Sequence, residues 1–281
     1  MSYEKKNSGF FTGVLIFLLF PYVITILFNG LDAGLMDRPV DVEAFLPGIV
    51  SKQITSDYEL ETIKCQAVIA RSNLYRKLRA EKEISGVLDV LQENSGFSYN
   101  DGSWITRVLP DEIYEKAVKD TKGQVLLYEG ELKLVPYHEI SNGQTRSGTE
   151  VLHDETYSYL KSVDSSADKK SPDYLNSTYI LQEQMPENLK ISERDSTGYV
   201  TSLLADGHIL EGEAFRQGMQ LSSSSFTIQK VGKKYRFLCK GRGHGLGFSQ
   251  YGGNEMAKEG NTWKEILEAY FPAMECGYMS S

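Results

Sequence analysis

The chain is poor in cysteine, and its cysteines form no recognisable motif. Its 281 residues include only three, Cys65, Cys239 and Cys276. An odd number at wide spacing excludes a disulfide framework. Buried free thiols are the expected state, and a Cys239–Cys276 disulfide is left open. The sequence also lacks CxxC and HExxH patterns, so we expect no metal site and no cofactor.

Positive charge is scarce as well. Lys and Arg number 30 against 38 Asp and Glu, which gives a formal net charge of −8. A nucleic-acid partner would require a basic surface that neutralises phosphates, so this balance argues against one. An uncharged sugar substrate is left open. Apolar residues make up 41% of the chain and charged residues 24%, which favours a globular protein over a disordered one.

One long run without charge lies near the N-terminus, from Phe10 to Phe28. Its length approaches the ~30 Å of bilayer hydrocarbon. Lys5 and Lys6 precede it, and the positive-inside rule then predicts a cytoplasmic N-terminus. We expect a cytoplasmic tail at 1–9, a single transmembrane helix at 10–29, a linker at 30–42 and an extracytoplasmic domain at 43–276. A cleaved signal peptide is the alternative.

Helices and hairpins alternate beyond this run without a regular βαβ rhythm, so the expected fold class is α+β. Helical spacing predicts a helix over 57–80, opened by a capping box at Ser56–Glu59. A second helix is expected over 111–121, and a third begins at the capping box Thr262–Glu265. Hairpins are predicted around Glu129-Gly130 and around Gly232-Lys233.

Glycine occupies every second position from Gly241 to Gly247. If the preceding strand continues through this segment, all four glycines lie on one face. That face would carry no side chains, so a ligand or another backbone can approach closely. A flat sugar polymer fits such a floor. A glycine-rich bend in the core is the alternative, and a dinucleotide loop would require a helix that starts within the segment.

Several motifs occur together and in a fixed order. The segment 243–252 reads GHGLGFSQYG and resembles the G-H-G-x-G-[MF]-S-Q-Y-G signature of the stage II sporulation protein D family, which also includes amidase-enhancer proteins. The segments 44–50, 61–72, 141–145 and 159–163 are similar to the family's opening Y-L-x-G-V-V, its E-A-L-K-A-Q-A-V-A-A-R-T helix, its S-x-G-x-T loop and its Y-L-x-S-V.

The resemblance implies a lytic transglycosylase that cuts peptide-stripped peptidoglycan glycan strands during forespore engulfment. Its implied partners are a cell-wall amidase, a membrane protein of the engulfment complex and the cell membrane. The chemistry requires one carboxylic acid, which protonates the leaving oxygen and then deprotonates the sugar's 6-hydroxyl. Such a group requires a raised pKa and therefore partial burial.

The chain departs from the family pattern at the acid. By ungapped alignment, Gln53 occupies the position of the glutamate that the resemblance identifies as catalytic. Glutamine keeps the shape of glutamate but has no acidic proton. Glu61 is a nearby candidate for the catalytic acid. Stabilisation of a helix N-terminus is an equally good explanation for a glutamate at this position.

The remaining residues are candidates for substrate binding, with a structural role as the alternative for His138 and core packing as the alternative for Tyr251. They are His138, Ser141, Asn142, Thr145, Gly243, His244, Gly245, Ser249, Gln250 and Tyr251. Three functions stay open: an active transglycosylase, a glycan-binding relative that does not cut, and a partner that stimulates an amidase.

Overall fold

The computed structural model describes residues 42–80 and 111–279, and residues 43–281 cluster into one compact unit. The helices are η2 (Val42–Phe45), α2 (Leu46–Gln53), α3 (Leu60–Ala80), α6 (Glu112–Asp120), α7 (Gly148–Leu152), η3 (Glu155–Tyr157), η4 (Ser166–Lys170), η5 (Gln182–Gln184), α8 (Gly212–Gly218), α9 (Gln250–Lys258) and α10 (Trp263–Tyr270). The strands are β1 (Gln124–Leu127), β2 (Tyr137–His138), β3 (Leu175–Leu181), β4 (Leu189–Arg194), β5 (Val200–Ala205), β6 (His208–Glu211), β7 (Phe226–Val231), β8 (Lys234–Lys240), β9 (Phe248–Ser249) and β10 (Glu275–Tyr278).

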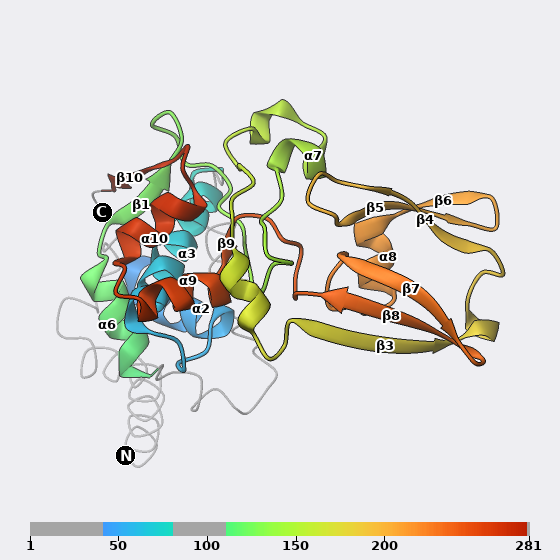
Figure 1. Cartoon of the computed structure of the whole chain (residues 1–281). Coiled ribbons are helices and arrows are strands. Elements are labelled where there is room, and N and C mark those ends of the chain that lie inside the picture. Colours follow the sequence, from blue (N-terminus) through green and yellow to red (C-terminus); the bar gives the residue numbers. More distant parts are fainter. Residues whose placement is uncertain (1–41, 81–110, 280–281) are drawn as a thin grey trace, which may run out of the picture. The chain divides into compact units, whose positions relative to one another are not determined.

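Helix α3 is the centre of the helical part of this unit. Its inward face carries Ile63, Ala67 and Ala70, which are nearly or fully buried, and also the buried polar residues Gln66 and Arg71. Helices α2 and α6 pack on it together with α9 and α10 from the C-terminal end of the chain (Figure 1). The small side chains of the face allow this close approach, so the two chain ends share one core.

Strands β3 to β8 form two three-stranded sheets with a core of their own, whereas β1 pairs with β10 and β2 with β9. The strand orders are β3-β8-β7 and β4-β5-β6, and every neighbouring pair is antiparallel. Three aromatic rings meet between these sheets and α8: Phe215, Phe226 and Phe237 lie 5.7–5.9 Å apart by centroid. The segments 137–147 and 241–249 connect this core with the helical one.

Local sequence signals predict several of these elements well. The hairpin around Gly232-Lys233 is confirmed as β7–β8, and α6 and α10 lie where they were expected. Thr262 and Glu265 form the predicted capping box of α10. Helix α3 is also present, but it begins at Leu60, and the side chain of Asn254 accepts the Glu59 backbone N–H at 2.8 Å.

The hairpin expected around Glu129-Gly130 is wrong in its second strand. Tyr128 and Glu131 form only an isolated bridge, and β1 pairs instead with β10, which is about 150 residues away. The C-terminal strand satisfies the hydrogen bonds of β1, because Leu126 and Cys276 lie opposite each other. Within the described residues, all three cysteines are free thiols.

The predicted fold class requires one correction. The described structure is α+β, but no helix in residues 42–80 and 111–279 combines the length and apolarity needed to cross a membrane. Helix α3 has 21 residues but carries Glu61, Lys64 and Arg71. The transmembrane helix predicted at 10–29 lies outside the described residues. The expected fold class, with its membrane helix, is therefore replaced by α+β alone.

Candidate functional site

Three glutamine side chains meet where α2, α3 and α9 converge. Gln66 donates from Nε2 to Oε1 of Gln53 at 2.7 Å. Gln250 donates from Nε2 to Oε1 of Gln66 at 3.1 Å and to the backbone oxygen of Gln53 at 2.7 Å. We call these three residues the amide cluster. Gln66 and Gln250 are buried and Gln53 is half-buried, so Gln53 is its outermost member.

Two tyrosines and an acid flank the amide cluster. Tyr251 follows Gln250, and its backbone N–H donates to the Glu139 carbonyl oxygen at 3.0 Å. Burial, followed by the charges of Glu139 and Asp168, raises the pKa of Tyr58 to about 12. Tyr58 and Tyr251 are both half-buried, and the Glu139 carboxylate is exposed. This surface therefore combines amide and phenol groups with aromatic rings, which suits a sugar.

The second acid near this surface, Asp168, is fully buried. Its Oδ2 accepts the Ser141 backbone N–H at 2.7 Å and the Ser165 hydroxyl at 3.0 Å. The Ser249 hydroxyl donates to both carboxylate oxygens at 2.9 Å. Burial raises the pKa of the Asp168 carboxyl, and the hydrogen bonds from the serines oppose that shift. Asp168 thus joins the S-N-G-Q-T loop to the start of α9.

Ser141 and Ser249 were predicted to contact substrate. Both are 0% exposed, and both direct hydrogen-bonding groups to Asp168. Ser249 also accepts the Gly252 backbone N–H at 3.4 Å as the N-cap of α9. In this structure they hold the loop and the helix in place.

Glu61 does not join the amide cluster. Its Oε1 accepts from Lys64 at 2.7 Å, and its Oε2 accepts the backbone N–H of Trp263 at 2.9 Å. Trp263 is the first residue of α10, so Glu61 holds the N-terminus of that helix against α3. Both carboxylate oxygens of Glu61 are occupied by structural contacts.

The glycine segment differs from the predicted flat strand. Gly241, Gly243, Gly245 and Gly247 all have positive φ angles, between 68° and 108°. A Cβ added at Gly241 would lie 2.5 Å from the Ile140 carbonyl oxygen, and one at Gly245 would lie 2.6 Å from the Tyr199 ring. At Gly247 it would overlap the Pro136 carbonyl oxygen. The glycines therefore admit other parts of this chain, and the expected bare floor is covered.

Two histidines lie against the glycine segment, with ring centroids 5.8 Å apart. Nδ1 of His138 lies 3.0 Å from the Leu246 carbonyl oxygen, and no described residue partners its buried Nε2. Burial and the neighbouring His244 lower the pKa of His138 to about 3. Burial also lowers the pKa of His244, whose Nδ1 accepts the Leu246 N–H at 3.1 Å. Both imidazoles are therefore neutral at pH 7.

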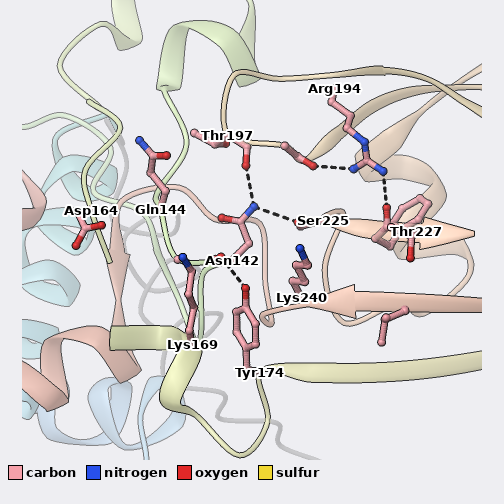
Figure 2. Close-up of a pocket in the computed structure, with 14 residues that line it drawn as sticks. Asn142, Gln144, Asp164, Lys169, Tyr174, Arg194, Thr197, Ser225, Thr227 and Lys240 are labelled. Carbon is pink, nitrogen blue, oxygen red and sulfur yellow. Dashed lines mark hydrogen bonds between the residues drawn. The ribbon is translucent and has the colours of Figure 1, made fainter. Parts of the chain in front are cut away.

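The other two residues of the predicted loop are also firmly held. Asn142 donates from Nδ2 to the Thr197 carbonyl oxygen at 2.8 Å and to the Ser225 hydroxyl at 3.0 Å (Figure 2). The Thr145 hydroxyl accepts the Val163 backbone N–H at 2.9 Å. The Y-L-K-S-V segment at 159–163 therefore pairs with the loop. Within the described residues, no group of three His, Cys, Asp or Glu could hold a metal ion.

Comparison with known proteins supports the family resemblance. The family described as "Stage II sporulation protein" matches residues 36–128. Stage II sporulation protein D of Bacillus amyloliquefaciens is 28% identical over 257 residues, which cover 84% of this chain and 74% of that protein. Its namesake in Bacillus subtilis (strain 168) is 27% identical, over 83% of this chain and 73% of that protein. These similarities confirm the resemblance of the chain to the stage II sporulation protein D family.

A further relative shows how far the family extends. The amidase enhancer of Bacillus subtilis (strain 168) is 25% identical over 291 residues, which cover 81% of this chain and 39% of that protein. The sporulation protein D relatives thus align over most of both sequences, whereas the amidase enhancer shares one part of a longer chain. The similarity to this chain therefore extends from the sporulation proteins to the amidase enhancer.

Four structurally important side chains were not predicted. Gln66 has a detectable signal, because it is a polar residue inside the apolar face of α3. Arg146, 3% exposed, pairs with Asp195 at 2.6 Å and donates to the His244 carbonyl oxygen at 3.2 Å. Asp168 and Asp195 both lie in the polar stretch 154–220, where no motif distinguishes them from surface acids.

Proposed function

We propose that this sporulation protein binds peptide-stripped peptidoglycan glycan strands at the surface around the amide cluster, and that it cuts them poorly or not at all. The observation that carries the proposal is the hydrogen bonding of Gln53 to Gln66 and Gln250. Gln53, at the position that the family resemblance assigns to the acid, is thereby hydrogen-bonded to Gln250 of the glycine signature. An amide thus stands at the position where the proposed chemistry requires a carboxyl.

The chemistry follows from the three amides. A lytic transglycosylase requires a group that gives up a proton and then takes one back. A neutral amide does neither near pH 7, whereas it donates and accepts hydrogen bonds with sugar hydroxyls. No described residue accepts a hydrogen bond from Nε2 of Gln53, which leaves those N–H groups available.

The nearby carboxyls do not replace the missing acid. Asp168 is 0% exposed and accepts hydrogen bonds from three residues. Glu61 is occupied by Lys64 and Trp263. Glu139 is exposed and pairs with Arg242 at 3.2 Å.

Co-sedimentation with insoluble peptidoglycan tests the proposal. The full chain should sediment with peptide-stripped glycan. Tyr251→Ala should weaken this binding about tenfold, because a tyrosine ring beside the amide cluster is lost. Tyr179→Ala is the matched control, since Tyr179 is 51% exposed on β3. A wild-type chain that stays in the supernatant would refute the proposal, and equal binding by Tyr251→Ala would refute the location.

A second function is favoured by the similarity to an amidase enhancer. In this role the chain would hold stripped glycan while it stimulates a cell-wall amidase. Adding the full chain to such an amidase should then raise the rate of stem-peptide release, and an unchanged rate would exclude the role. Both functions require a domain outside the cytoplasm, where peptidoglycan lies.

A further inference from the structure

A pocket of about 630 Å³ lies between the S-N-G-Q-T loop and the strands that follow it. Asn142, Gly143 and Gln144 form one wall, and β7, β8 and the 194–198 turn contribute others. Figure 2 shows Lys169 and Lys240 extending into the same space, from η4 and from the end of β8. None of the residues of the amide cluster lines this pocket.

The pocket is positively charged on an acidic protein. Its lining contains three cations, Lys169, Arg194 and Lys240, and one acid, Asp164, so its formal charge is 3 − 1 = +2. The whole chain carries −8. A local charge of opposite sign to the net charge favours an anionic ligand at this place over the rest of the surface.

Lys169 and Lys240 carry the positive charges that are available to a ligand in this pocket. The guanidinium of Arg194 donates to the carbonyl oxygens of Gly198 and Phe226, both at 2.7 Å. Asp164 accepts from the Ser166 hydroxyl at 2.9 Å. No hydrogen bond or ion pair links the ammonium group of Lys169 or Lys240 to another residue in the described part of the chain.

The pocket wall is rigidly held. The side chain of Asn142 is fixed by Thr197 and Ser225, and the Tyr174 hydroxyl donates to its backbone oxygen at 2.8 Å. Gly143 has φ +110°, and a Cβ there would collide with the Lys169 side chain. The glycine therefore lets Lys169 lie across the loop. Such fixed positions reduce the ordering cost of binding.

The pocket is also connected to the proposed glycan surface. Lys169 directly follows Asp168, which holds Ser249, the residue before Gln250. A single loop and a single short helix thus contribute both to the pocket and to the frame of the amide cluster.

We propose that this pocket binds the lactyl carboxylate of a peptide-stripped muramic acid residue. The inference rests on the proposed glycan-binding function and deepens it. In an intact strand this carbonyl belongs to a neutral amide that carries the stem peptide. Hydrolysis of the amide leaves one carboxylate on each muramic acid. The two ammonium groups of Lys169 and Lys240 suit that carboxylate, so the pocket selects stripped strands over peptide-bearing ones.

Calorimetric titration of the full chain with two soluble tetrasaccharides tests this proposal. One is a peptide-free muramic-acid-containing tetrasaccharide, and the other is chitotetraose, which has the same linkage without the lactyl group. The wild-type chain should prefer the first by about tenfold or more, because a hydrogen bond to a charged group contributes at least ~1.5 kcal/mol. The preference should shrink in high salt.

Paired lysine variants test whether this preference for the muramic-acid-containing sugar arises in the pocket. Lys169→Gln/Lys240→Gln should lose the preference and keep the affinity for chitotetraose. Lys170→Gln/Lys234→Gln is the control, because it removes the same charge from the same short helix and the same strand outside the pocket. Equal wild-type binding of both sugars, or a preference that survives in Lys169→Gln/Lys240→Gln, would overturn this inference alone. Binding of neither sugar would instead overturn the proposed function.

Discussion

The glycine segment 241–247 and the amide cluster meet at residues 248–250, but they use polar and small residues differently. In the glycine segment, missing side chains admit other parts of the chain, such as Pro136, Ile140 and Tyr199. In the amide cluster, polar side chains bond to one another and leave Gln53 half-buried at the surface. The glycine signature is thus largely a framework, and the position proposed to decide the chemistry, Gln53, is nearly 200 residues earlier.

This difference has a consequence for the family's defining motif. An intact framework keeps Gln250 and Tyr251 in place whether or not an acid is present at position 53. Ser249 and Ser141 serve the same framework through Asp168. A chain can therefore retain the glycine signature in full and still lose catalytic activity. Substitutions in the two regions should then affect different properties, stability in one and glycan chemistry in the other.

The largest expected effect is in the glycine segment. Gly247→Ala should lower the free energy of unfolding by at least about 3 kcal/mol, because it combines left-handed backbone strain with a backbone clash at Pro136. Gly130→Ala is the matched control, since Gly130 has φ +76° and open space around it. It should cost only about 1 kcal/mol. Denaturant unfolding measures both, and equal losses would contradict a framework role for the segment.

A smaller effect concerns acid stability. The pKa of His138 is about 3 in the folded state, below the ~6.5 of an unfolded histidine. The unfolded state therefore binds more protons between these values, and the stability that His138 contributes is lost as the pH falls. Below pH 6.5, this histidine should lower the free energy of unfolding by up to about 1.4 kcal/mol for each unit by which the pH falls.

A substitution isolates this contribution. His138→Asn keeps a donor for the Leu246 carbonyl oxygen and removes the titration, so the unfolding free energy should depend less on pH between 6.5 and 5. His208→Asn, at an exposed position on β6, should leave the wild-type slope unchanged. An unchanged slope in His138→Asn would show that His138 is not buried against the glycine segment as described.

The sequence predicts those features that depend on neighbouring residues. The capping box of α10 and the β7–β8 hairpin each require a few adjacent residues, and both are present. Pairing over long distances leaves no such signal, so β10 was missed as the partner of β1. Alternating glycines predicted a flat strand, because the spacing shows where side chains are absent but not the sign of φ.

Prediction of the candidate site is limited in the same way, because its contacts join residues that are far apart in the sequence. The motifs brought Gln53 and Gln250 to attention separately, and their hydrogen bond depends on the packing of α2, α3 and α9. Asp168 could not be selected, because burial of a carboxyl is a property of the folded chain. Glu61 was selected for its place in a motif, and its contacts with Lys64 and Trp263 give it a structural role.

The most direct test of the account is the substitution Gln53→Glu, assayed on peptide-stripped glycan by mass spectrometry of 1,6-anhydro ends. Glutamate is nearly isosteric, so Gln66 should still donate to one oxygen and leave the other for proton transfer. Gln217→Glu on α8 is the control for added charge. We predict few anhydro ends from the wild type and from the control, and about 10²-fold more from Gln53→Glu, the lower range of general acid–base catalysis. Efficient cutting by the wild type, or a Gln53→Glu chain that binds glycan without cutting it, would contradict the assignment of the missing acid to position 53.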